Sequence, residues 1–272
     1  MSSFSDRKKK KEIKYRMSFV LLFIAASFLV CFVLYMREET PDEEMRKNDS
    51  PAQTVKIDEP GEMSVQVSHD TDNPVGECLK LDISYLDRCM FAGDSLMVGL
   101  GSYGFVPEDR IAAGVGMSVM DIGTKPLTEA DGSELLAADK INARSPENLY
   151  ILLGLNMMES FTDVQLLAAY GDFVNSIDRT ATEIYVISVP PVTSEREQNE
   201  DKPILNADID RFNADLLKFA DDRGLHYLDL NSVMKDNEGF FMSEYAEEDG
   251  IHFKKAAYEA FIDYILTHVH IK

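Results

Sequence analysis

The sequence predicts an α/β fold: a three-layer α/β/α sandwich with a five-stranded parallel sheet, preceded by one transmembrane helix. Two observations predict it. Five short apolar runs alternate with stretches of helical periodicity, and a run of 20 residues without a charge, 17–36, lies near the N-terminus. Strands that alternate with helices form parallel sheets covered on both faces. We therefore expect four regions: a cytoplasmic basic tail (1–16), a transmembrane anchor (17–36), a disordered acidic stalk (37–77) and a folded domain (78–272).

The charge-free run is long enough to cross a membrane, because about 20 apolar residues span the ~30 Å hydrocarbon core. Seven Lys and Arg residues precede it and acidic residues follow it. This asymmetry predicts a cytoplasmic N-terminus and an extracytoplasmic domain, and so a single-pass protein of the cell membrane. A cleaved signal peptide is the alternative, but its apolar core would be about 7–15 residues with a small-residue cleavage site beyond. This run is longer and ends at Tyr35-Met36-Arg37-Glu38, which favours an uncleaved anchor.

The stretch from 37 to 77 holds four prolines and many acidic residues without apolar periodicity. Such a segment cannot bury enough surface to offset its chain entropy, which predicts a flexible stalk. Cys78 and Cys89 follow, and an oxidising exterior permits a disulfide between them. The alternative is that Cys89 is a small buried residue on a strand. The sequence leaves both open.

The chain of 272 residues is strongly acidic, with 48 Asp and Glu against 27 Lys and Arg and a formal net charge of −21. Because nucleic acids are polyanions, binding to them normally needs a basic face. The composition therefore argues against a nucleic-acid partner. Hydrophobic residues make up 45% of the chain, which is enough to build a core.

The elements of the domain follow from the spacing of apolar residues. Ile209, Phe212, Leu216 and Ala220 repeat at helical spacing, with Gly224 as the expected stop. The apolar pattern from Tyr258 to Val269 predicts a closing amphipathic helix. The apolar runs suited to buried strands are 87–92, 110–113, 148–153, 183–189 and 225–230.

Polar and glycine-rich segments stand directly after these strands, and ligands of open α/β sheets bind outside the carboxyl ends of the strands. A serine hydroxyl is a poor nucleophile until a histidine takes its proton, and a carboxylate fixes the histidine tautomer. The oxyanion of the intermediate needs preset donors, such as backbone N–H groups and a carboxamide. Four segments deliver these groups to one edge: Gly93-Asp94-Ser95-Leu96, Gly114-Val115-Gly116, Gly154-Leu155-Asn156 and Asp249-Gly250-Ile251-His252.

The segments FAGDSLMVGL, GVG, LLGLN and DGIHF, in this order, resemble the four blocks of the SGNH hydrolases, also called the GDSL lipase/esterase family. The resemblance covers about residues 86–268 and implies a flavodoxin-like sandwich. It implies Ser95 as nucleophile and first oxyanion donor, His252 as base and Asp249 as its orienting carboxylate. It implies Asn156 as a further oxyanion donor, and one glycine donor, Gly116 with Gly114 as the alternative. Many members have Asp after the block-three asparagine, whereas Met157 stands here.

Simpler interpretations exist for several of these residues. Gly-Asp-Ser is also a common turn, Asn156 could cap the segment after it, and Asp94 is interpreted as a hydrogen-bonding group of the Ser95 turn. The glycines of 99–104 match G-x-G-x-x-G, but a dinucleotide site needs the first glycine straight after a strand. We expect no cofactor and no metal, since no metal-ligand spacing is present. His226, inside a predicted strand, is interpreted as a core or surface histidine.

The predicted function is a serine esterase or acylhydrolase that cleaves an acyl ester, such as acetyl, on a small molecule or a cell-envelope carbohydrate. One alternative is a carbohydrate O-acyltransferase with the same Ser-His-Asp site, for which a separate membrane protein would supply the acyl donor. The other is a tethered glycan-binding domain without turnover. The charged segment 190–204 follows the fourth strand and forms either a wall of the cleft or a solvated loop.

Overall fold

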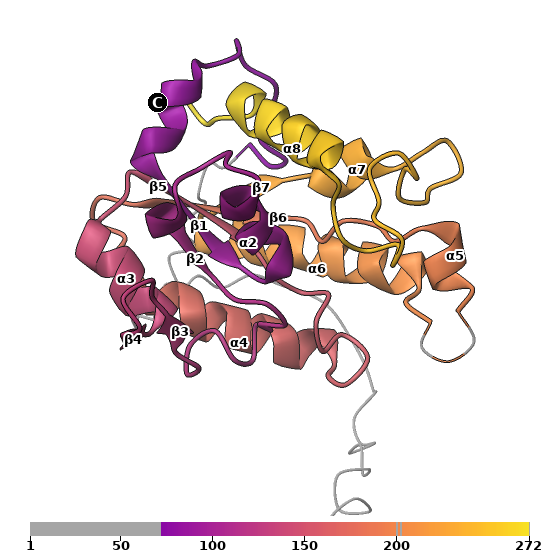
Figure 1. The fold of residues 1–272 in the computed structure, drawn as a ribbon, viewed down its shortest axis with the longest axis horizontal. Helices are drawn as coiled ribbons and strands as arrows, with labels where there is room; N and C mark the ends of the chain where they lie inside the picture. Colours follow the sequence, from indigo (N-terminus) through magenta and orange to yellow (C-terminus); the bar gives the residue numbers. More distant parts are fainter. Residues whose placement is uncertain (1–71, 200, 202, 272) are drawn as a thin grey trace, which may run out of the picture. The chain divides into compact units, whose positions relative to one another are not determined.

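The five apolar runs form one sheet in which every neighbouring pair of strands is parallel (Figure 1). This computed structural model describes residues 72–199, 201 and 203–271. The strand order is β2-β1-β5-β6-β7, the flavodoxin-like arrangement, and the predicted five-stranded parallel sheet is confirmed. The strands are β1 (Cys89–Gly93), β2 (Ile111–Ala113), β5 (Asn148–Leu152), β6 (Glu183–Ile187) and β7 (His226–Leu228).

Beyond the polar first residues of β5, β6 and β7, the strands are apolar because both faces of the sheet are covered. Successive side chains of a strand point to opposite faces. In β1, Met90 and Ala92 belong to one hydrophobic core, and Cys89 and Phe91 belong to the other. All four are fully buried. Continuous burial of this kind gives apolar runs without alternation, which is the pattern that the sequence shows.

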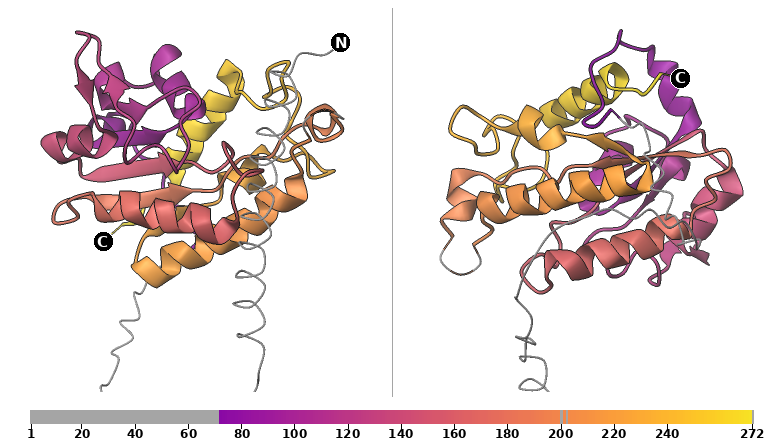
Figure 2. Two further views of the ribbon diagram at one scale, coloured as in Figure 1. Left: turned by 90° about the horizontal axis from the view of Figure 1, so that it is seen from below. Right: turned by 180° about the vertical axis from the view of Figure 1, so that it is seen from behind.

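Helices cover both faces and complete the three layers (Figures 1 and 2). One core packs under η1 (Ile83–Arg88), α2 (Ser95–Ser102), α7 (Leu230–Met234) and α8 (Lys255–Thr267). The other packs under α3 (Ala137–Arg144), α4 (Asp163–Asn175) and α6 (Asn206–Arg223). The remaining elements are η2 (Glu108–Arg110), the antiparallel pair β3 (Leu127–Thr128) and β4 (Glu134–Leu135), and α5 (Ser194–Glu197).

The two predicted helices end where their sequences change. Helix α6 ends at Arg223 because Gly224 adopts a left-handed conformation, with φ of 60°, which glycine tolerates without a steric cost. Helix α8 ends at Thr267, so Val269 lies beyond it, although Val269 is still buried in the core. The apolar stripe therefore continues slightly past the helix that it predicts.

The predicted tail, the predicted anchor and most of the predicted stalk fall in residues 1–71, outside the described residues. No helix of the described part is long and apolar enough to cross a bilayer. The last stalk residues belong to the domain, which corrects the boundary predicted at residue 78. Val75 is buried, and its N–H donates to the Tyr227 carbonyl at 2.9 Å. The side chain of Asn73 donates to the Leu225 carbonyl at 2.9 Å and accepts from the Tyr227 N–H at 2.7 Å. So short a segment has no periodicity by which to be recognised.

The question of the cysteine pair has a structural answer in the described residues. Cys78 and Cys89 are both free thiols. Cys89 is fully buried on β1, and burial raises the pKa of its thiol to about 12. It therefore acts as a small apolar residue of the core.

Candidate active site

The candidate site lies where the chain crosses from one face of the sheet to the other. β1 pairs with both β2 and β5, and the helix that leaves β1 covers the opposite face from the helix that leads into β5. In open α/β sheets such a reversal opens a crevice at the carboxyl ends of the two central strands. Ser95 follows β1 and Asn156 follows β5, so both stand at this crevice.

Ser95 is held at the start of α2 by the two residues before it. A Cβ on Gly93 would lie 2.3 Å from the Leu152 carbonyl oxygen, so only glycine allows β1 and β5 to approach here. Asp94 caps the helix, and its carboxylate accepts a hydrogen bond from the Leu96 N–H at 2.9 Å. Ser95 is then the first helical residue, and its own N–H has no partner within the helix.

A chain of hydrogen bonds joins Ser95, His252 and Asp249. The Ser95 Oγ lies 2.9 Å from the His252 Nε2. The other ring nitrogen, Nδ1, contacts the Oδ2 of Asp249. The second carboxylate oxygen of Asp249 accepts from the backbone N–H groups of Ile251 and His252, each at 3.0 Å. The carboxylate is thus fixed by its own turn and directed at the imidazole.

The electrostatics favour a charged carboxylate at Asp249. Partial burial acts to raise the pKa of this group. The hydrogen bonds from the His252 ring and from the backbone N–H groups of His252 and Ile251 outweigh burial, and the pKa of Asp249 is lowered. A negative carboxylate against Nδ1 holds the proton on that nitrogen and leaves Nε2 free to accept the serine proton.

The loop that carries Asp249 and His252 rests on the segment after β6. Gly250 adopts a φ of +72°, and its carbonyl accepts from the Thr193 N–H at 3.1 Å. A Cβ on Gly250 would lie 2.4 Å from the Thr193 Oγ1 and 2.8 Å from the Arg196 Cβ. Only glycine therefore fits between Asp249 and His252 while the loop remains in contact with residues 193–196.

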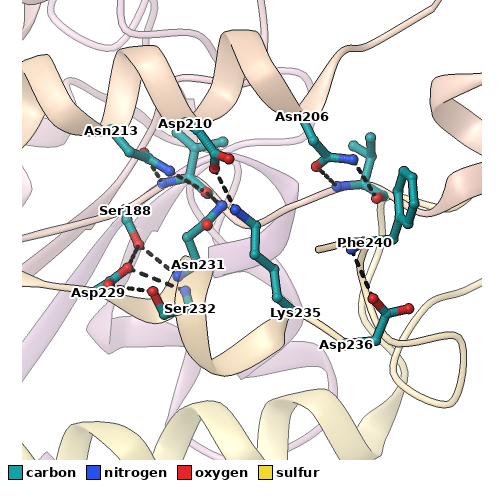
Figure 3. A network of polar contacts seen from close by, with 12 residues as sticks. Ser188, Asn206, Asp210, Asn213, Asp229, Asn231, Ser232, Lys235, Asp236 and Phe240 are labelled. Carbon is teal, nitrogen blue, oxygen red and sulfur yellow. Dashed lines mark hydrogen bonds and ion pairs between the residues drawn. The ribbon is translucent and has the colours of Figure 1, made fainter. Parts of the chain in front are cut away.

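Buried asparagines hold the segment after β6 in turn (Figure 3). Asn206 binds both the N–H and the carbonyl of Val192, at 2.9 and 3.0 Å. Asn213 binds both backbone groups of Val189, at 2.8 and 2.9 Å, and Asn231 donates to the same carbonyl at 2.8 Å. These side chains replace the strand partners that the segment lacks beyond the sheet. The support reaches from α6 and α7 through this segment to His252.

The two candidate glycines after β2 differ in whether their backbone N–H is used. The N–H of Gly114 donates to the Gly93 carbonyl at 3.2 Å, which extends the strand pairing. Gly116 stands third in a turn closed by the Met117 N–H and the Gly114 carbonyl at 3.0 Å, and its φ is +69°. A turn of this type favours glycine at that position. Within the described part of the chain no hydrogen bond uses the Gly116 N–H, so Gly116 rather than Gly114 has a donor to offer.

Asn156 contacts two groups through its amide nitrogen. Nδ2 donates to the Met117 carbonyl at 2.9 Å and lies 3.4 Å from the Oδ2 of Asp94. The first contact is an ordinary hydrogen bond, whereas the second is long and weak. One amide hydrogen of Asn156 is therefore used in the bond to Met117. The hydrogen that faces Asp94 is the one that could be donated to a ligand oxygen.

Asp94 is only 3% exposed. Burial raises the pKa of its carboxyl to about 6, against the opposing effects of the Leu96 N–H and of His252. The interpretation of Asp94 as a group of the Ser95 turn describes only part of its contacts. Its carboxylate also reaches Asn156 and so joins the segments after β1 and β5.

A model of the GDSL-like lipase/acylhydrolase family matches residues 91–260, more than half of the chain. The chain belongs to this family. It is therefore an enzyme of a family that hydrolyses esters. No curated protein matches the sequence.

Solved structures of bacterial proteins resemble this GDSL enzyme. One, from Streptococcus pneumonia and provisionally described as a platelet activating factor, is 19% identical over 65% of this chain and 81% of its own, with a TM-score of 0.52. A GDSL-like lipase from Bacteroides thetaiotaomicron is 14% identical over 69% and 89%, with a TM-score of 0.49. An acetylxylan esterase from Geobacillus stearothermophilus is 14% identical over 68% and 94%, with a TM-score of 0.47. The similarity to the Streptococcus structure supports the fold described above.

A cavity of about 260 Å³ lies beside Asn156 in this GDSL enzyme. Met157 and Met158 line it, together with Arg196 and Ile204 from the segment 190–204. The described residues of this segment therefore form a wall next to the site, one of the two alternatives left open by the sequence. The sequence did not single out Thr193 or Arg196. A Thr at the start of a short helix is a capping signal, but nothing in the sequence shows which loop it contacts.

The other residues that the sequence singled out lie apart from this chemistry. Gly99, in the G-x-G-x-x-G match, belongs to the interface of α2 with α8, since a Cβ there would overlap the Tyr258 hydroxyl at 1.7 Å. His226 is 6% exposed within β7 and stacks between the rings of Tyr185 and His270. Among the described residues no group of three His, Cys, Asp or Glu side chains is placed to hold a metal.

Proposed function

We propose that this GDSL enzyme is an extracytoplasmic serine esterase that removes a small acyl group, such as acetyl, from a cell-envelope carbohydrate. The observation that carries the proposal is the hydrogen-bond chain from Ser95 through His252 to Asp249. Ser95 is the nucleophile, His252 the general base and Asp249 the group that orients His252. Segment 17–36 is the membrane anchor.

The first half of the reaction forms an acyl-enzyme. The Ser95 Oγ attacks the ester carbonyl carbon while its proton passes to the His252 Nε2 at 2.9 Å. Negative charge develops on the carbonyl oxygen, and the N–H groups of Ser95 and Gly116 and the amide of Asn156 are the donors for it. The intermediate collapses, the bond to the alcohol oxygen breaks, and His252 returns the proton to the leaving alcohol.

The second half repeats these steps with water. Water attacks the acyl carbon as His252 takes one of its protons, and the bond to the Ser95 Oγ then breaks. The serine recovers its proton from His252, and the free acid is released. Asp249 remains negative throughout and stabilises the imidazolium in both halves.

The proposed substrate and location rest on the sequence at the N-terminus. A basic tail, a charge-free run and an acidic segment precede the domain, which supports an anchored enzyme facing the outside of the cell. Acylated glycans of the cell envelope would lie within reach of such a domain. Protease treatment of intact cells tests this location, because an outward domain is digested and a cytoplasmic domain is protected.

Turnover by the purified full-length chain tests the chemistry. We expect hydrolysis of a short-chain aryl ester and release of acetate from acetylated glycan. Ser95→Ala should lower kcat by about 10⁴-fold or more. Ser102→Ala is the matched control, because this exposed serine lies in the same helix and bonds only the Val98 carbonyl. Wild-type turnover by Ser95→Ala would exclude the mechanism.

Two further readouts separate the alternatives. A fluorophosphonate probe should label Ser95, and absence of both labelling and turnover would favour a glycan-binding domain. Analysis of the products formed in the presence of an added sugar acceptor distinguishes hydrolysis of the acyl-enzyme from transfer of its acyl group. Free acetate supports hydrolysis, whereas an acetylated acceptor shows that the same Ser95 centre transfers the group.

A further inference from the structure

Among the described residues, the cavity beside Asn156 combines an apolar surface with a cation that has no ion-pair partner. Leu155, Met157, Ile204 and Leu205 supply apolar lining, and Arg196 supplies the cation. Met157 adopts a φ of 75°, an uncommon conformation for a residue other than glycine and one that concentrates at functional sites. The wall next to Asn156 is thus held in an unusual backbone geometry.

Arg196 is the unexplained group of this cavity. Its Nε is buried and has no hydrogen-bond partner, and its guanidinium makes no ion pair within the described residues. Leaving a buried donor unsatisfied costs free energy, and it costs more when the donor belongs to a charged group. A ligand anion in the cavity that Arg196 lines would supply the charge partner that its guanidinium lacks among the described residues.

The other charged residues that the structure describes at the cavity, Asp208 and Glu159, do not neutralise Arg196. Asp208 is already paired with Arg211, which also contacts Asp163. Glu159 is exposed to solvent, where a charge is well screened. The partly buried guanidinium therefore carries the stronger local field.

Arg196 also stands next to the reacting groups. A Cβ built on Gly250, which lies in the loop that carries His252, would stand 2.8 Å from the Arg196 Cβ. Asn156, a proposed oxyanion donor, lines the same cavity. A ligand group bound in this cavity therefore lies beside a proposed oxyanion donor.

We infer that the cavity binds an anionic group of the ester substrate, a carboxylate or a phosphate, through the guanidinium of Arg196. The inference rests on the proposed function and narrows its substrate to acylated acidic carbohydrates or polyol phosphates. Guanidinium presents a planar fork of donors that matches both groups. Because the whole chain carries −21, an anionic substrate is repelled at long range, so a dedicated cation is needed close to the site.

Matched substrate pairs test the inference with the full-length chain. The first pair is methyl O-acetyl-glucuronide and methyl O-acetyl-glucoside, which differ only in a carboxylate or hydroxymethyl group. The second is acetylated glycerol 3-phosphate and acetylated glycerol. We expect kcat/KM to be about tenfold or more higher for the anionic member of one pair, and that pair identifies the source of the anion. Wild-type preference for the neutral member of both pairs overturns the inference without any variant.

Two variants assign the preference to Arg196. Arg196→Gln should abolish the preference by lowering kcat/KM about tenfold or more further for the anionic ester than for the neutral ester, and Arg196→Lys should keep part of the preference. Arg88→Gln is the control, because it removes the same charge from an exposed pair with Glu147 at the start of β1. Equal losses on neutral and anionic esters in Arg196→Gln would show a structural role only and overturn the inference.

Binding separates failure of this inference from failure of the proposed function. Methyl glucuronide and glycerol 3-phosphate are titrated calorimetrically into the Ser95→Ala chain, with and without Arg196→Gln. Binding that depends on Arg196, without turnover of any ester by the wild type, refutes the esterase and keeps the anion site. Turnover with no preference and no Arg196-dependent binding keeps the esterase and refutes the anion site.

Discussion

Replacement of Gly250 by alanine tests whether contact with Thr193 positions the loop that carries His252. The new Cβ would lie 2.4 Å from the Thr193 Oγ1 and 2.8 Å from the Arg196 Cβ, whereas ordinary contact begins at 3.4 Å. The closer contact is thus about 1 Å too short. Both opposing atoms are near the backbone, and the segment that bears them is fixed by buried asparagines, so the loop rather than the segment has to move.

The size of the effect follows from the shift. A misplacement of about 1 Å at a reacting group costs about 10²-fold in rate, which corresponds to about 2.7 kcal/mol of transition-state stabilisation. Alanine at a φ of +72° adds backbone strain of about 1–2 kcal/mol, which lowers stability without acting on the reaction. We therefore expect Gly250→Ala to lower kcat about 100-fold in a protein that is still folded.

Gly104→Ala is a closely matched control. Gly104 has nearly the same φ, +74°, but a Cβ there meets nothing within 4 Å. Both variants therefore place alanine at a positive φ, but only Gly250→Ala brings the new Cβ into steric overlap with neighbouring residues. The assay is kcat on an aryl ester, with thermal unfolding to measure stability. Wild-type kcat in Gly250→Ala, or an equal loss of kcat in Gly104→Ala, would refute the reasoning.

Three further predictions concern single groups. Asp94→Asn should remove a pH dependence of stability: the folded pKa of about 6 exceeds the unfolded value of about 3.9. The wild type should therefore lose about 2 kcal/mol relative to the variant between pH 4 and 7 in urea unfolding, and a constant difference would contradict this. Asn156→Ala should lower kcat by about 10²–10³-fold with little change in KM; a change in KM alone would contradict the oxyanion role. Iodoacetamide should alkylate Cys78 in the native protein but leave Cys89 unmodified until unfolding, because burial raises the pKa of Cys89 to about 12; equal rates would contradict this burial.

Most of the fold could be predicted because local sequence and tertiary environment agree. The run 148–153 predicts a buried strand, and β5 is Asn148–Leu152. Gly224 predicts the end of α6 and adopts the left-handed conformation that ends it. The predicted domain start at 78 is too late because Asn73 and Val75 are held by hydrogen bonds with Leu225 and Tyr227. A few isolated contacts of this kind leave no periodic pattern in the sequence.

The candidate site was predictable to the extent that each segment follows a strand. Parallel strands deliver their carboxyl ends to one edge, so Ser95 and Asn156 could be brought together from topology alone. The choice between Gly114 and Gly116 could not be made in this way. The choice depends on which of the two glycine N–H groups donates to the Gly93 carbonyl. The register in which β1 pairs with β2 decides this. Arg196 was missed because its isolation only becomes visible once its neighbours are placed.

The short segments that carry the chemistry are joined to one another by contacts between non-neighbours in the sequence. Asp94 caps the helix of Ser95 and reaches Asn156, so the segments after β1 and β5 are fixed relative to each other. Gly250 fixes the loop of His252 against Thr193. The hydrogen bond of 2.9 Å between the Ser95 Oγ and the His252 Nε2 is therefore set from both sides. A substitution of Asp94 or Gly250 should therefore alter the distance between the Ser95 Oγ and the His252 Nε2, although neither Asp94 nor Gly250 takes part in proton transfer. Two reacting groups on separate segments are aligned only as well as the contacts that join those segments.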